Sequence, residues 1–339
     1  MNKPNLFNFA TSELSQDAFI AWLLTWANKE YAEIDKNLHD CAVDFVRKLL
    51  NKDDYVVEIV NVTTQWKHTD ISAEVNGEYF LLIEDKTATK EHAGNLKYVE
   101  MAKKHYEKTN FKVIPVYFKM EEQGNYAALK AVGYDIFTRE QMLPILENYY
   151  SIITEVNKND ILLDYFFHLK ALDKKINGFK TLPLNEWYWN SWKGFFFAIQ
   201  KEVNSWSDWH YVHNQSGGFL GFWWHFKHQE HSGSKYEIYL QLEHPARKEI
   251  ENKLVFKIST TDIQLRRKIR DFYRAKLLDT AKEQNIKINK FGSLGESMGV
   301  AKLSGDFRVP APNGLIDLPA TIENLKKMEQ LLNSVVEKL

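Results

Sequence analysis

The chain opens with apolar positions at helical spacing. One stripe recurs every three or four residues: Phe19, Trp22, Leu23 and Trp26. Ser12 or Ser15 can cap this helix, and the acidic Glu13 suits its first turn. A second apolar stripe predicts another helix over about residues 38–50.

The pattern then changes to period two, which is typical of strands. We expect three strands, over residues 56–60, 68–75 and 79–83. Asn76-Gly77, between the last two, is the strongest hairpin signal in the chain. Further segments are expected as a helix over 93–108, a buried strand over 111–118, and helices over 139–150 and 161–172. Helix, three strands, helix and strand is the order of an α/β sandwich.

Residues 174–183 contain Lys, Asn, Gly and Pro, so we place a boundary there between domains 1–175 and 180–339. Beyond it lies a dense aromatic stretch: Trp187, Tyr188, Trp189, Trp192, Phe195, Phe196 and Phe197. Strands near 219–227, 236–243, 253–259 and 300–307, with helices over 262–284 and 319–339, complete the chain. This half is expected to be an α+β domain with an antiparallel sheet.

Composition narrows the classes of protein. The 339 residues carry 44 Lys and Arg against 45 Asp and Glu, so any nucleic-acid contact must come from a local patch. One cysteine, Cys41, excludes an internal disulfide and a thiolate-rich zinc site. No apolar stretch is long enough for a membrane span, and residues 1–5 do not look like a signal peptide. We therefore expect a cytoplasmic protein without a membrane partner.

The residues that indicate chemistry are Asp70 and the run Glu84-Asp85-Lys86 at the end of a hydrophobic strand. Hydrolysis of a phosphodiester needs oxygen ligands for a hard divalent ion and a positive group beside the phosphate or water. Because side chains alternate along a strand, Glu84 and Lys86 share a face and Asp85 points the opposite way. Asp85 still offers its backbone carbonyl to a metal.

The position of Asp70 depends on the length of the hairpin connection. With a two-residue Asn76-Gly77 turn, Asp70 would pair with Ile83 and face away from Glu84. A three-residue connection, or a bulge, would bring Asp70 opposite Glu84. The nuclease interpretation therefore predicts an odd-length connection or a bulge.

This pattern resembles the PD-(D/E)XK nuclease superfamily, whose core has the order α-β-β-β-α-β. The resemblance implies that Asp70 and Glu84 bind Mg²⁺ or Mn²⁺ and that Lys86 orients or activates the water. The run Glu13-Leu14-Ser15-Gln16-Asp17-Ala18-Phe19 is similar to a bacterial subgroup in which an acidic residue of the first helix, here Glu13, reaches the metal. Asn95 and Tyr98 stand where many members carry a Gln and a Tyr, with Asn in place of Gln. The motifs cover residues 8–120, and Thr69 replaces the Pro of the name.

Several of these features have simpler interpretations. Glu13 also suits the dipole of a helix N-terminus, and Asn95 and Tyr98 also suit surface and core positions. Arg267, Arg270 and Arg274 share one helical stripe that can contact phosphates or form a solvated face. Histidines gather in the second half at His210, His213, His225, His228 and His231. Their spacing matches no zinc pattern closely, and a packed sheet with polar edges is favoured.

Three hypotheses follow from the sequence. The first is a metal-dependent nuclease acting on DNA, or less favourably on RNA, with a homodimer left open. The second is a catalytically inactive module with a nuclease fold that binds nucleic acid or a protein, in which Asp70 and Glu84 would fail to converge. The third is an interaction protein that uses its aromatic C-terminal half, and a large exposed apolar patch there would favour it.

Overall fold

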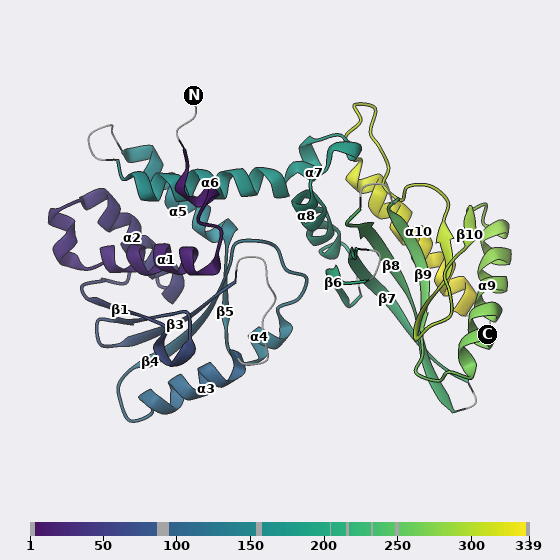
Figure 1. Cartoon of the computed structure of the whole chain (residues 1–339), viewed down its shortest axis with the longest axis horizontal. Coiled ribbons are helices and arrows are strands. Elements are labelled where there is room, and N and C mark those ends of the chain that lie inside the picture. Colours follow the sequence, from purple (N-terminus) through teal and green to yellow (C-terminus); the bar gives the residue numbers. More distant parts are fainter. Residues whose placement is uncertain are drawn as a thin grey trace. The chain divides into compact units, whose positions relative to one another are not determined.

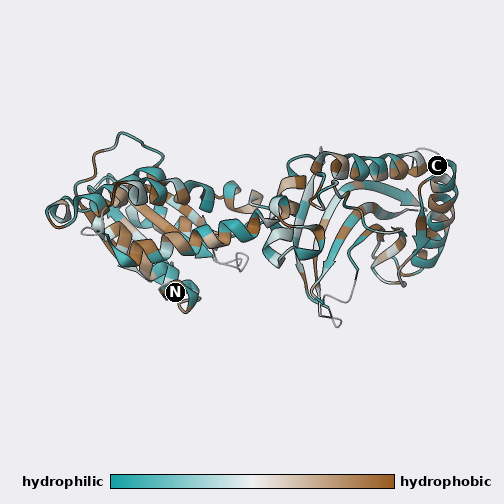
Figure 2. Ribbon diagram, turned by 90° about the horizontal axis from the view of Figure 1, so that it is seen from above, coloured by the Kyte–Doolittle hydropathy of each residue, from teal (hydrophilic) through white to brown (hydrophobic). Residues whose placement is uncertain are grey.

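The chain forms two compact units, each built on its own sheet (Figure 1). The computed structural model describes residues 4–86, 95–153, 158–203, 205–214, 217–231, 233–247 and 251–336. The first unit comprises Met1–Glu122 with Tyr126–Lys174, and the second comprises Gln123–Asn125 with Lys175–Leu339. Figure 2 shows hydrophobic residues along the strands and helices of both units, interspersed with hydrophilic ones.

The sheet of the first unit is mixed. It has five strands in chain order: β1 (Val60–Thr64), β2 (Ile71–Val75), β3 (Tyr79–Lys86), β4 (Lys112–Lys119) and β5 (Asp135–Thr138). β1, β2 and β3 are antiparallel neighbours, whereas β3, β4 and β5 run parallel. The expected α/β class with an antiparallel hairpin feeding a buried strand is confirmed.

Helices cover both faces of this sheet. They are α1 (Glu13–Trp26), α2 (Lys36–Leu50), α3 (Asn95–Tyr106), α4 (Ala127–Ala131), α5 (Arg139–Ile152) and α6 (Asp160–Ile176). Short 3₁₀ turns are η1 (Leu6–Asn8), η2 (Lys29–Glu33) and η3 (Trp66–His68). Residues of α1, α2, α5 and α6 share the larger core with one face of the sheet, and α3 packs on the other face (Figure 1).

Strand β3 is buried along its whole length. Leu81 and Ile83 belong to the core beneath α1 and α2, while Phe80 and Leu82 pack with α3. A strand covered on both faces is expected to be continuously hydrophobic, as this one is up to Ile83. The polar residues that follow therefore lie at the end of a fully covered strand.

The hairpin between β2 and β3 has a three-residue connection, Asn76-Gly77-Glu78, because Val75 pairs with Tyr79. Asn76 and Gly77 both have left-handed backbone angles, with φ of 52° and 68°. Ile71 pairs with Ile83, so the next pair in this register would be Asp70 with Glu84. The odd-length connection predicted from the sequence is confirmed.

The expected strand over 56–60 is wrong, since β1 begins only at Val60. The side chain of Asn76 replaces a neighbouring strand at that point. Its Oδ1 accepts hydrogen bonds from the backbone N–H groups of Glu58 (2.9 Å) and Ile59 (3.0 Å). The extended backbone before Val60 is thus bonded to a turn residue instead of a strand.

The second unit holds an antiparallel six-stranded sheet in the order β10-β11-β9-β8-β7-β6. Its strands are β6 (Ser207–Val212), β7 (Phe219–His231), β8 (Ser234–Pro245), β9 (Lys253–Ser259), β10 (Ile288–Lys290) and β11 (Ser297–Leu303). Its helices are α7 (Gly178–Thr181), α8 (Trp189–Gln200), α9 (Leu265–Glu283) and α10 (Leu318–Val336), with a 3₁₀ turn η4 (Leu184–Glu186). The predicted antiparallel α+β organisation is confirmed.

Much of the aromatic stretch of the second unit serves its core. Trp192, Phe195 and Phe196 of α8 are buried with Phe222 and Trp224 of β7. In neither unit does a described helix combine the length and apolar character that a membrane span requires.

Candidate active site

Three carboxylates from three elements converge on one lysine in the first unit. The Nζ atom of Lys86, the last residue of β3, lies 2.9 Å from Glu84 Oε1 and 3.1 Å from Asp70 Oδ2. It also lies 3.8 Å from Oε2 of Glu13, the first residue of α1. Lys86 and Glu84 are buried, whereas the side chains of Asp70 and Glu13 are 21% and 37% exposed. The cluster therefore reaches solvent on the side of Asp70 and Glu13.

The backbone of β3 holds Asp70 in this position. Asp70 stands just before β2, and its Oδ2 accepts a hydrogen bond of 2.9 Å from the backbone N–H of Asp85. Lys86 Nζ also donates to the backbone carbonyl of Asp85 at 2.7 Å. Because the contact from Asp85 to Asp70 uses a main-chain N–H group, the position of the Asp70 carboxylate follows from the hairpin register.

Burial strongly affects the charge of this cluster. It raises the pKa of Glu84 to about 7, and the negative charge of Asp70 acts in the same direction while Lys86 opposes it. Burial lowers the pKa of Lys86, but hydrogen bonds and charges from Glu84 and Asp70 outweigh it and raise that pKa above its usual range. Glu84 Oε2 is buried and has no hydrogen-bond partner. The cluster thus retains an oxygen able to accept a further proton or cation.

Asp85 points to the opposite face of β3, as strand parity predicted, and is fully buried against α1 and α6. Gln16 Nε2 donates to its Oδ1 at 2.5 Å, and Tyr165 OH donates to Gln16 Oε1 at 3.4 Å. The carboxyl group of Asp17 also lies close, and its negative charge acts to raise the pKa of Asp85. Burial raises the pKa of Asp17 to about 7 and that of Asp85 well above its usual range.

Sequence reasoning had not singled out Gln16. The available signal was its spacing, because Gln16 and Asp17 follow Glu13 by three and four residues on a helix and so lie on the same side of it. These side chains join α1 to the end of β3 directly behind the cluster around Lys86.

The two residues expected on the helix after β3 are less informative. Asn95 begins α3, but its side chain lies outside the described residues. Tyr98 is half-buried and packs against the small apolar cluster that includes Phe80 and Leu82. Tyr98 therefore serves at least partly in core packing.

The arginine stripe of α9 belongs to the second unit and is not uniformly available to a ligand. Arg274 donates to the backbone carbonyls of Val300 (2.9 Å) and Phe291 (2.8 Å). Arg270 forms an ion pair of 2.7 Å with Asp271, whereas Arg267 is exposed. At least Arg274 therefore serves to link segments within the second unit.

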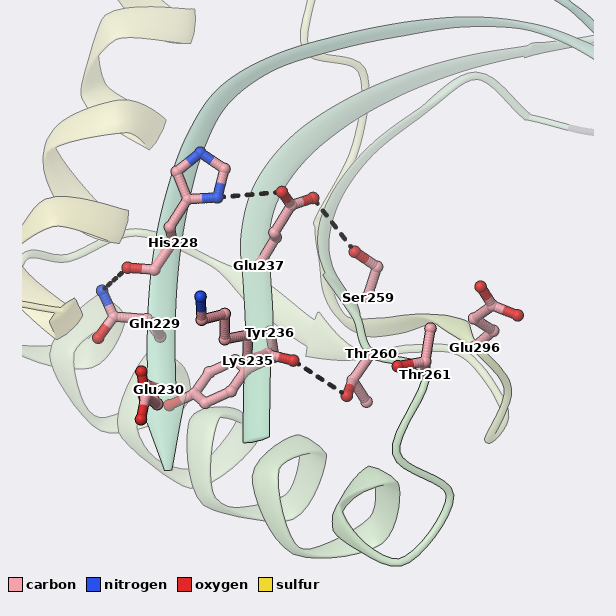
Figure 3. A pocket seen from close by; sticks show the side chains of 10 residues that line it. All are labelled: His228, Gln229, Glu230, Lys235, Tyr236, Glu237, Ser259, Thr260, Thr261 and Glu296. Atoms are coloured by element: carbon pink, nitrogen blue, oxygen red, sulfur yellow. Dashed lines mark hydrogen bonds and ion pairs between the residues drawn. The ribbon is translucent and has the colours of Figure 1, made fainter. Parts of the chain in front are cut away.

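A cavity of about 670 Å³ lies in the second unit. Figure 3 shows the side chains around it: His228, Gln229, Glu230, Lys235, Tyr236, Glu237, Ser259, Thr260, Thr261 and Glu296. His228 Nδ1 contacts Glu237 Oε1 at 3.0 Å, and both side chains are largely exposed. His210 instead lies against Trp223, with ring centroids 4.4 Å apart and the rings tilted by 35°. His210 in β6 and His228 in β7 thus have different neighbours, which agrees with the packed-sheet interpretation.

Across the described part of the chain, no group of three or more His, Cys, Asp or Glu side chains is arranged to hold a metal ion. In the first unit the ammonium of Lys86 stands among the three carboxylates. Comparison with protein-family models, curated proteins and solved structures gave no match for this chain. Its function therefore has to be inferred from its own residues.

Proposed function

We propose that this protein is a nuclease of the PD-(D/E)XK type that uses Mg²⁺ or Mn²⁺ to hydrolyse phosphodiester bonds, with DNA as the favoured substrate. The observation that carries the proposal is the convergence of Glu13, Asp70 and Glu84 on Lys86. These four residues come from the first helix and from the two sides of one hairpin, and their convergence depends on the three-residue hairpin connection.

The oxygen atoms of the cluster are of the kind that a hard divalent ion takes, although with Lys86 among them they are not arranged around an ion. Three carboxylates offer the oxygen ligands that Mg²⁺ and Mn²⁺ prefer, and Glu84 Oε2 is a buried oxygen without a partner. Glu13, Asp70 and Glu84 would hold the ion, with the Asp85 carbonyl as a further oxygen. When bound, the ion would neutralise charge on the phosphate and make water more acidic.

The remaining roles fall to the side chains. Lys86 supplies the positive charge among the carboxylates, and its ammonium can donate to a phosphate oxygen or to the attacking water. Asp70 and Glu13 are the partly exposed members, so substrate approaches from their side. The buried Glu84 keeps Lys86 in place through the shortest of the three contacts.

One observation favours the alternative of an inactive module with a nuclease fold. Lys86 already forms ion pairs with the carboxylates, and an ammonium locked among them would prevent metal binding. The two functions differ in one measurable property, since only the nuclease binds a divalent ion at this cluster.

The test is cleavage of labelled single- and double-stranded DNA and RNA with Mg²⁺, Mn²⁺ or EDTA. We expect metal-dependent cutting of DNA that Glu84→Ala and Lys86→Ala each reduce by at least a hundredfold, because loss of one electrostatic contact to the transition state costs about that much. Glu58→Ala, which removes an exposed ion pair with Lys29, is the matched control and should cut normally.

Isothermal titration calorimetry with Mn²⁺ completes the experiment. A folded wild type that neither cuts any of the four substrates nor binds Mn²⁺ would refute the nuclease and favour the binding module. Cutting that survives both substitutions would place the chemistry elsewhere.

A further inference from the structure

The loop that leads into Asp70 has an unusual backbone. Gln65, Lys67 and His68 have positive φ angles of 56°, 48° and 72°. Left-handed angles are tolerated mainly by Gly and Asn, and three of the other positive-φ residues in the described chain are indeed Asn. A loop that keeps Gln, Lys and His at such angles is strained, and strain of this kind persists where the side chains are needed.

The side chains of this loop gather into a small basic cluster with α3. Lys67 Nζ lies 4.7 Å above the ring of Trp66 and 3.2 Å from Nδ1 of His105. Lys67 and His105 are both exposed, and no described carboxylate forms an ion pair with Lys67. An ammonium and an imidazole held together at the surface without an acid between them leave donors for an anion.

The tautomer of His105 follows from this contact. Because the ammonium of Lys67 has only protons to give, Nδ1 of a neutral His105 accepts, and the ring proton is then on Nε2. The pair consequently offers N–H donors from both side chains, the kind of group that contacts phosphate oxygens.

The cluster lies on the same side of the sheet as Glu84. The ring of Trp66 packs 5.0 Å from that of Phe80, which shares its face of β3 with Glu84. Phe80 and Glu84 are four positions apart in β3, or about 13 Å along the strand.

We propose that Lys67 and His105 form a phosphate-binding site for the backbone of the nucleic acid, on the side of the sheet that carries Glu84. The proposal rests on the nuclease function and adds to it the element that holds the substrate. Trp66 supports the lysine from below, and the strained loop couples this contact to Asp70, which follows it directly.

The test is binding of a short fluorescein-labelled DNA duplex in EDTA, followed by anisotropy at several salt concentrations. Each phosphate contact contributes about 0.9 to the slope of log K against log salt, so Lys67→Ala should lower the slope by about one and weaken binding about five- to tenfold near 0.1 M salt. His105→Ala should weaken binding as well. In the cleavage assay, Lys67→Ala should raise KM and leave kcat within about twofold of wild type, because the contact binds ground and transition state alike.

Lys52→Ala is the matched control. Lys52 is also exposed and also lies over an aromatic ring, 5.7 Å from Tyr79, but Tyr79 is at the opposite end of β3 from Lys86. Lys67→Arg, which keeps the charge, should retain the salt slope. Thermal melts establish that each variant is folded.

The outcomes separate this proposal from the proposed function. A wild type that cuts DNA while Lys67→Ala binds like Lys52→Ala overturns the phosphate site and leaves the nuclease intact. A wild type that binds DNA with the expected dependence on Lys67, but never cuts, supports the phosphate site and refutes the nuclease. No binding and no cutting refutes both.

Discussion

Replacing Lys86 by Met is the sharpest perturbation of the cluster, because it removes the ammonium and keeps a chain of similar length. Glu13, Asp70 and Glu84 then face one another without a positive charge. Removing one partner of a buried ion pair costs about 3–5 kcal/mol. Since water screens Asp70 and Glu13 in part, we expect the lower end, about 3 kcal/mol of unfolding free energy.

This loss can be followed by thermal unfolding in EDTA. For a domain of this size, about 1 kcal/mol corresponds to about 2–4 °C, so Lys86→Met should lower Tm by about 6–12 °C. Mn²⁺ should then restore most of it, because an ion present at about a hundred times its Kd stabilises the folded state by about 2.7 kcal/mol. The same variant should not cut DNA, since the group that contacts phosphate or water is gone.

Lys36→Met, which breaks an exposed pair with Asp40, is the control and should change Tm by no more than about 2 °C. The reasoning is refuted if Lys86→Met melts like wild type in EDTA, because the carboxylates then do not depend on the ammonium. It is also refuted if Mn²⁺ stabilises Lys86→Met no more than it stabilises wild type.

Three other predictions concern the surroundings of the cluster and the second unit. Asp17→Asn keeps a side chain that can donate to Asp85 and should retain cleavage within about fivefold. Asp17→Ala should lose at least tenfold in kcat, measured with saturating DNA. Equal activity of the two variants would argue against a positioning role of Asp17. Asn76→Ala removes the oxygen that accepts hydrogen bonds from the N–H groups of Glu58 and Ile59. It should lower the free energy of unfolding, measured in urea, by about 2 kcal/mol. A loss below about 0.5 kcal/mol would contradict the explanation given for the start of β1. Burial lowers the pKa of His244 to about 4, so the folded state holds it neutral while the unfolded chain binds a proton below about pH 6.5. The stability that His244 contributes is therefore complete above that pH and is lost as the pH falls towards 4, by about 2 kcal/mol at about pH 5. A His244→Gln variant should lack this part of the pH dependence of stability. Parallel wild-type and variant curves of stability against pH, measured by urea unfolding, would contradict the prediction.

The central residues of the candidate site could be predicted because their positions depend on the alternation of side chains between the two faces of a strand. Alternation along a strand places Glu84 and Lys86 on one face and Asp85 on the other, and the same rule turned the position of Asp70 into a prediction about hairpin length. The observed register agrees with it. Element order and the antiparallel second sheet followed from hydrophobic periodicity in the same way.

What the sequence did not indicate depends on three-dimensional contacts. The hydrogen bonds that Asn76 accepts from Glu58 and Ile59 displaced the start of β1, although four of residues 56–60 are β-branched and apolar as in a strand. β5 has four residues with only Phe137 fully buried, too short a signal for periodicity. The guanidinium of Arg274 is bound to carbonyls far away in the sequence, which no local pattern records.

The three-residue connection also restricts how this gene segment can change in length. Ile71 pairs with Ile83, and both belong to the larger core. The register that places Asp70 opposite Glu84 is therefore also the register that buries the apolar side chains of β2. Deleting or inserting one residue between Val75 and Tyr79 would turn β2 over relative to β3 and disrupt the apolar layer and the carboxylate cluster together. An insertion of two residues preserves the facing, whereas a deletion of two would leave a single residue, too short to join the strands, so only an insertion of an even number of codons is compatible with both fold and site.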